Sequence, residues 1–148
     1  MTLLTPEEWN ELEFDYERRV KDIVIPPDPT TTDIKNLISQ IDAVYTEVRV
    51  THSRIRSAFE NIKTALSMVK SGLFNELFEE GRNNDERDAL VNEALSRVSY
   101  EETDQTMIEA KKELRRRKMF MDDIVKSLDA KRDMLITDSS ILKIEASI

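Results

Sequence analysis

The sequence contains no cysteine, and among its 148 residues there are only two glycines, four prolines and one histidine. Without cysteine there is no disulfide framework, thiolate nucleophile or thiol metal ligand, which fits a reducing compartment. The scarcity of glycine and proline indicates long helices. The sequence also shows no basic region followed by an apolar one at its start, and no apolar run of membrane-spanning length. We therefore expect a cytoplasmic protein that does not associate with membranes.

Signatures of catalysis and of metal binding are also absent. The single histidine, His52, has Arg49 three residues before it instead of the acid of a Glu-x-x-His metal pair. Adjacent carboxylates such as Asp122 and Asp123 point to different sides of a helix. No glycine-rich phosphate loop, calcium loop or zinc-ligand spacing occurs. We expect no enzymatic activity, no cofactor and no metal site, and we interpret His52 as a packed or partner-facing residue.

The strongest pattern in the sequence is a heptad repeat over residues 34–73. One row falls on an apolar β-branched residue at every seventh position: Ile34, Ile41, Val48, Ile55, Ile62 and Val69. A second row, four residues later, carries Ile38, Tyr45, His52, Phe59, Leu66 and Leu73. Together with flanking Leu37, Val44 and Ala58, these rows form a stripe that is too wide for a two-stranded seam. The pattern predicts a long helix that packs against two or more neighbours.

A second heptad series predicts a return helix. It consists of Tyr100, Met107, Leu114, Met121, Leu128, Leu135 and Leu142. Two such helices joined near residues 81–85 form a long antiparallel hairpin. The predicted fold is all-α: an acidic amphipathic helix in residues 1–25, a proline- and threonine-rich linker in 26–33, and the hairpin in 34–148, assembled as a coiled-coil or bundle oligomer.

Local signals place the ends of these helices. Thr5 and Pro6 are typical of a helix start, and Gly81 followed by Asn83 is typical of a stop and restart. Within the hairpin, Ser71-Gly72 and Ser99 are both possible breaks. Thr137-Asp138-Ser139-Ser140 indicates the end of the return helix and the cap of a short last helix over residues 141–148.

The wide stripe also predicts self-association. Two helices cannot cover it, and β-branched residues in the first row favour higher-order bundles over parallel dimers. We therefore expect a homo-oligomer that uses Ile34, Ile41, Val48, Ile55, Ile62 and Val69. The first helix bears Trp9, Leu12 and Tyr16 at helical spacing, so we expect it to fold back on the hairpin or onto a neighbouring subunit, with Trp9 buried.

Charge is unevenly distributed along this acidic chain, whose net charge is −8. Residues 1–33 carry −6, whereas 34–72 hold six bases and three acids. Six bases then occur within eight residues, at 111–118. If the hairpin turns near residue 83, residue 118 lies level with about residue 48, and the bases form one belt around the hairpin. The members of this predicted belt are Arg49, Arg54, Arg56, Lys111, Lys112, Arg115, Arg116, Arg117 and Lys118. It suits a phosphate backbone or an acidic protein surface.

The order of parts resembles the UvsY-like recombination mediators of T-even-type phages. The resemblance rests on the helix with Tyr45 and the stretch 51–55, the turn near Gly81, the return helix, and the closing segments 127–130 and 141–146. It implies a small helical protein that oligomerises, binds single-stranded DNA, and helps to load a recombinase onto strands coated by a single-strand binding protein. A phage-encoded member would act in the host cytoplasm.

Two other functions remain open from the sequence. A structural or adaptor coiled-coil protein, such as a virion component, could pair the belt with the acidic first helix of a neighbour. An acidic inhibitor that mimics nucleic acid could use residues 1–33. Binding to single-stranded DNA over a salt series distinguishes the mediator from both.

Overall fold

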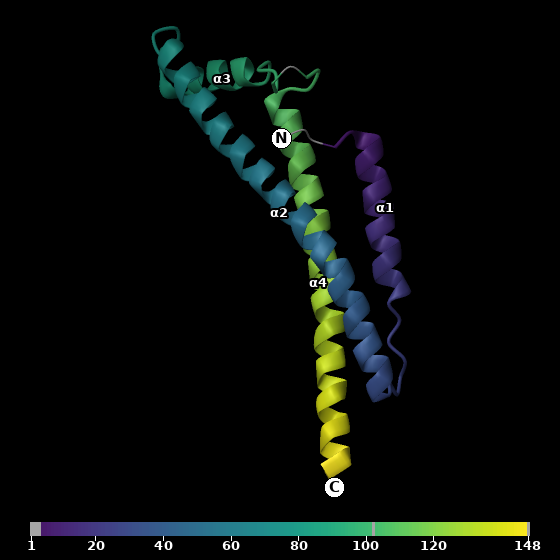
Figure 1. Cartoon of the computed structure of the whole chain (residues 1–148). Helices are drawn as coiled ribbons and strands as arrows, with labels where there is room; N and C mark the ends of the chain where they lie inside the picture. Colours follow the sequence, from purple (N-terminus) through teal and green to yellow (C-terminus); the bar gives the residue numbers. More distant parts are fainter. Residues whose placement is uncertain (1–3, 102, 148) are drawn as a thin grey trace. The chain divides into compact units, whose positions relative to one another are not determined.

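The computed structural model describes residues 4–101 and 103–147, and within them the chain forms helices and no strand. In chain order these are α1 (Pro6–Asp22), α2 (Thr31–Glu76), α3 (Asn84–Leu95) and α4 (Met107–Ser147) (Figure 1). The predicted all-α class is confirmed. The chain divides into two compact units: residues 1–53 with 119–148, here called the α1 unit, and residues 54–118, here called the α3 unit. The long helices α2 and α4 each contribute to both units.

The beginning of α1 follows the predicted signals. The Thr5 Oγ1 atom accepts a hydrogen bond of 3.2 Å from the Glu8 N–H, and Pro6 occupies the first helical position. Glu7 and Glu8 lie in the first turn, where negative charge is favourable next to the positive end of the helix dipole. After Asp22 the chain leaves the helix, and three prolines within residues 26–29 prevent its continuation.

In the α1 unit, α1 packs against both long helices. The Trp9 side chain is fully buried, and its ring meets the Phe120 ring of α4 edge to face, with 5.9 Å between centroids. On the other long helix, the Tyr16 hydroxyl lies 2.8 Å from Thr51 Oγ1. The prediction that α1 folds back with Trp9 buried is therefore confirmed.

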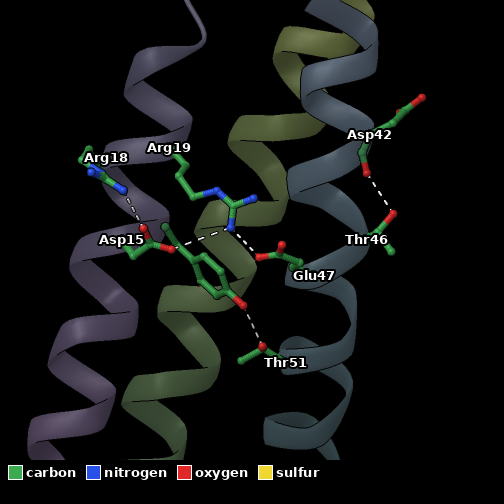
Figure 2. A network of polar contacts seen from close by, with 8 residues as sticks. Asp15, Arg18, Arg19, Asp42, Thr46, Glu47 and Thr51 are labelled. Atoms are coloured by element: carbon green, nitrogen blue, oxygen red, sulfur yellow. Dashed lines mark hydrogen bonds and ion pairs between the residues drawn. The ribbon is translucent and has the colours of Figure 1, made fainter.

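Polar contacts at the rim of this packing connect α1 to α2. Arg19 bonds to Glu47 and lies 3.7 Å from Asp15 of its own helix, while Arg18 donates to Asp15 at 2.9 Å (Figure 2). The hydrogen bond to Glu47 raises the pKa of the Arg19 guanidinium. Because position 16 contacts position 51 and position 19 contacts position 47, α1 runs antiparallel to this part of α2.

Two contacts fix the register of α2 against α4 in the same unit. Arg132 Nε donates to Asp42 Oδ1 at 3.3 Å, and Nε2 of His52 forms a hydrogen bond of 2.7 Å with Asp122 Oδ1. The helices run antiparallel at these contacts, and the predicted register is wrong by eight residues: a turn near residue 83 places residue 122 level with residue 44, and it pairs with residue 52 instead. The reason is that the 12-residue α3 and the segment after it lie between the two long helices in the chain. The helix α4 therefore begins later in the sequence than it would after a direct return.

In the α3 unit, the chain reverses after α2 at a buried glycine. A Cβ atom on Gly81 would lie 2.6 Å from Arg87 Cγ and 2.9 Å from the Arg87 backbone nitrogen. Arg87 in turn donates from Nε to the Phe78 carbonyl at 2.8 Å, and its guanidinium lies 3.9 Å from the centre of the Phe78 ring. Asn83 caps α3 by accepting a 2.9 Å hydrogen bond from the Glu86 N–H. The predicted stop and restart at this point is present.

Of the two possible breaks, the one at Ser99 is real. The helix α2 continues through Gly72 to Glu76, whereas residues 96–106 separate α3 from α4. Ser99 and Thr106 pair across this segment in an antiparallel manner. Thr106 and Glu109 then form a complete capping box, with N–H to side-chain hydrogen bonds of 3.2 and 3.3 Å.

The predicted short last helix does not occur within the described residues, because α4 is continuous from Met107 to Ser147. Two of the hydroxyls expected to cap a new helix bond backwards within α4. Thr137 Oγ1 donates to the Asp133 carbonyl at 3.0 Å, and Ser140 Oγ donates to the Ile136 carbonyl at 3.1 Å. Such back-bonding allows serine and threonine to remain inside a helix. Residue 148 lies outside the described residues.

A search of the described residues for a helix that is both long enough and apolar enough to cross a membrane finds none.

Candidate nucleic-acid interface

The candidate interface begins with the basic segment, residues 111–118, in the first turns of α4. The capping box at Thr106 starts the helix, and the side chains of Met107, Ala110 and Leu114 are buried along its first turns. This anchoring fixes which side of the helix each basic residue occupies.

The six bases of the segment differ in exposure. Lys112, Arg115 and Arg116 are exposed, whereas Lys111 and Lys118 are half-buried. Arg117 is only 3% exposed, which corrects the prediction that it belongs to the surface. Its position explains this burial: residue 117 lies three after Leu114 and four before Met121, on the buried face of α4. An arginine can occupy such a position because its long apolar stem packs while its guanidinium finds a partner.

One partner of Arg117 is a carboxylate within the segment. Glu113 Oε1 accepts a 2.9 Å hydrogen bond from Arg117 Nε and one of 3.0 Å from Arg116 Nη2. The hydrogen bond from Arg116 lowers the pKa of Glu113, and that from Arg117 lowers it further. One carboxylate therefore pairs with two of the six bases, so the side of the segment that presents positive charge outward is the side of Lys112 and Arg115.

The bases of α2 fall in different units. Arg54 and Arg56 are exposed residues of the α3 unit, the unit that also holds the basic segment. Arg49 belongs to the α1 unit, is exposed, and places its guanidinium 5.7 Å from the centre of the Tyr45 ring. The observed register puts Arg49 level with residue 125, seven residues beyond the basic segment. The predicted belt is therefore wrong in placing Arg49 level with residues 117 and 118.

The structure also shows a basic row of which the prediction used only Arg56. Arg56, Lys63 and Lys70 are seven residues apart on α2, and all three are exposed. The Lys63 ammonium lies 5.7 Å from the centre of the Phe59 ring. The signal was present in the sequence as a heptad spacing of bases, but the apolar rows beside it dominated the interpretation.

Most of the residues predicted to mediate oligomerisation are buried within the single chain. Ile34, Ile41, Val48, Ile55 and Ile62 are buried, and Val69 is half-buried. A second copy cannot pack on the buried part of this row while the chain keeps this structure. Any self-association must therefore use other surfaces.

No group of three or more histidine, cysteine, aspartate or glutamate side chains is arranged to hold a metal ion in the described part of the chain. His52, the only histidine, is about four-fifths buried and bonds to Asp122. It acts here as a packed residue that links α2 to α4.

Comparisons of the chain with protein-family models, with curated proteins and with solved structures give no match.

Proposed function

We propose that this protein is a homo-oligomeric recombination mediator that acts by binding and not by catalysis. In this proposal the basic segment binds the phosphates of single-stranded DNA, and the protein helps to load a recombinase onto strands that a single-strand binding protein covers. The observation that carries the proposal is the outward position of Lys112 and Arg115 within a segment of six bases in eight residues. The resemblance in order of parts to UvsY-like mediators supplies the biological role.

The distribution of charge between the units supports the same surface. Residues 54–118 contain thirteen bases and thirteen acids, so the remaining residues carry the whole net charge of −8. A polyanion is repelled by a strongly acidic surface and attracted by a local cluster of bases. The α3 unit is therefore the part of the molecule that suits a DNA strand, with Arg54 and Arg56 as further phosphate contacts.

The test is binding of a labelled single-stranded oligonucleotide across a salt series. Each phosphate contact on a single strand contributes about −0.7 to the slope of log affinity against log salt concentration. The variant K112Q/R115Q should therefore bind more weakly and flatten the slope by about 1.4. The matched control is K126Q/K143Q, which removes the same charge from exposed positions of the same helix in the α1 unit. It should leave the slope unchanged.

Arg117 and Arg116 are left intact in this design because they pair with Glu113, so their replacement would mix a loss of stability with a loss of binding. Failure of the parent protein to retain the oligonucleotide at low salt contradicts the proposal. Equal weakening by the two double variants contradicts the assignment to the basic segment.

A structural or adaptor coiled-coil protein is the second candidate. It is favoured by the exposed acids of α1, which include Glu7, Glu8 and Glu11 and offer an intermolecular partner for basic residues. This candidate predicts no retention of DNA, together with loss of assembly in K112Q/R115Q.

A further inference from the structure

The second half of α4 carries an apolar stripe on its outer side. Its members follow the alternating four- and three-residue spacing of a coiled-coil seam: Ala130, Met134, Thr137, Ile141 and Ile144. All five are exposed, and Met134, Ile141 and Ile144 are 55%, 49% and 61% exposed. This stripe is distinct from the inner face of the helix, where Leu128 and Leu135 are fully buried. Thr137, at the centre of the stripe, is nine residues after Leu128, which is two and a half turns and hence the opposite side.

Isolated apolar side chains are common on protein surfaces, but their spacing here is informative. Four of five consecutive seam positions are apolar, over about 22 Å of helix at 1.5 Å per residue. Such a row suits one long partner helix, because knobs from each helix enter holes of the other. It does not suit an anionic lipid surface, since acids at 133, 138 and 145 flank the row and the chain is acidic.

We propose that this row, here called the outer seam, pairs antiparallel with the outer seam of a second copy of the chain. The charges beside the seam decide the direction. Lys126 and Asp133 flank one side, and Lys131, Asp138 and Glu145 flank the other. In a parallel in-register pair, a residue in the row of Lys126 faces a residue of the other copy in the row of Lys131, five positions later in the sequence. That arrangement sets Lys126 against Lys131 and Asp133 against Asp138, so both pairs repel.

An antiparallel pair removes this repulsion. When Met134 faces Thr137 of the second copy, Ala130 faces Ile141, and Lys131 comes opposite Asp138. Because the dimer is symmetric, the pair of Lys131 and Asp138 occurs twice. Lys131 already donates to the Ile23 carbonyl in its own chain, but an ammonium has three donors and can serve both partners. The resulting contact is isologous, so it closes as a dimer and does not continue as a filament.

The outer seam gives the proposed self-association a specific surface, and it rests on that proposal. The row predicted from the sequence cannot supply this surface, because most of its residues are buried within the chain. The outer seam lies wholly in the α1 unit, so it is independent of the basic segment. DNA binding and dimerisation can therefore be tested separately.

The first test compares two single variants by sedimentation equilibrium. I141E introduces a charge into the seam, whereas I136E introduces the same charge at an apolar position of the same helix that is 45% exposed but lies off the seam. Burying an unpaired carboxylate in the seam should weaken self-association at least about a hundredfold. I136E should change it by less than about threefold, because its side chain stays in water. Both replacements keep a good helix former, so circular dichroism should show unchanged helicity.

The second test uses the absence of cysteine from the chain to read the direction of pairing. Full-length A130C and I141C are oxidised separately and as a mixture. The antiparallel seam predicts a disulfide-linked dimer in the mixture and none in either variant alone. Cross-linking of each variant with itself indicates a parallel pair and overturns the proposal.

Two further outcomes are distinguishable. If the parent self-associates but I141E and I136E behave alike, the seam is wrong while homo-oligomerisation stands. If the parent is a monomer at a concentration of about 100 μM, where even a weak dimer would be populated, the seam and the proposed self-association both fail.

Discussion

His52 on α2 and Asp122 on α4 form a hydrogen bond of 2.7 Å between residues that are seventy positions apart in the chain. Both side chains are partly buried, so water competes poorly with this contact. Together with the pair of Asp42 and Arg132, it defines which turn of α4 faces which turn of α2. A polar pair inside an otherwise apolar heptad row penalises a slip of the register, because a slip leaves both groups without their partner.

A double-mutant cycle should measure this coupling. We expect H52A and D122A each to destabilise the protein, and the double variant to lose less than the sum of the two, by about 1 kcal/mol. Urea denaturation followed by circular dichroism gives the free energies of unfolding. Additive effects would show that the two side chains do not interact in solution.

The docking of α1 should depend on Trp9. W9A removes a fully buried aromatic side chain and leaves a cavity against Phe120, so it should lower the free energy of unfolding by about 3 to 5 kcal/mol. F14A is the matched control, since Phe14 lies on the same helix but is 70% exposed. It should change the stability by less than about 0.5 kcal/mol. Similar losses in the two variants would contradict the observed packing of α1.

The two glycines should respond to alanine in opposite ways. G72A places a methyl group where no atom lies within 4 Å apart from the adjacent residues and backbone of its own helix, and should stabilise the protein by up to about 1 kcal/mol. G81A brings a methyl group to 2.9 Å from the Arg87 backbone nitrogen and should destabilise it by roughly 1 to 3 kcal/mol. Thermal unfolding of both variants checks the pair. A shift of the same sign in both would mean that the turn after α2 adapts to a side chain.

The acid sensitivity of the α3 unit should involve Glu113. Its pKa is lowered in the folded state below its ordinary value of 4.5, chiefly by the hydrogen bond from Arg116. A lowered folded pKa contributes stability that is present above the unfolded pKa and is lost as pH falls through the folded value. The parent should therefore lose stability below about pH 4.5, and E113Q should lose less over that range.

At neutral pH the E113Q variant should be less stable by about 1 kcal/mol, because a neutral amide oxygen accepts weaker hydrogen bonds from Arg116 and Arg117 than a carboxylate does. E93Q is the control, since Glu93 pairs with Arg97 in an exposed bridge in which the side chains are 62% and 76% accessible. Exposed bridges contribute little, so E93Q should change the stability by less than about 0.5 kcal/mol. Urea denaturation from pH 3 to pH 7 provides both comparisons.

The heptad pattern was a sound guide to the interior of the helices. Ile41, Val48 and Leu128 are buried as their rows predict, because period and burial both follow from helix geometry. The helix starts at Thr5 and Asn83 were also predictable, since a capping side chain acts within a few residues of its own position.

The register of the hairpin was not predictable from the same pattern. A heptad row specifies which face of a helix is buried but not which turn of the partner it meets, so it cannot show that α3 separates the two long helices. Arg117 illustrates a second kind of limit. Its spacing from Leu114 indicates burial while its charge indicates exposure, and the sequence pattern alone does not decide between them.

The single tryptophan of the chain gives the docking of α1 an optical consequence. Because Trp9 is the only indole and its ring is fully buried beside Phe120, emission excited selectively from tryptophan comes from one contact. Release of α1 from the long helices would move that indole into water and shift the emission to the red. Any ligand, second copy or DNA strand that displaces α1 would therefore be detected without a label, whereas binding that leaves α1 in place would be silent in the same experiment.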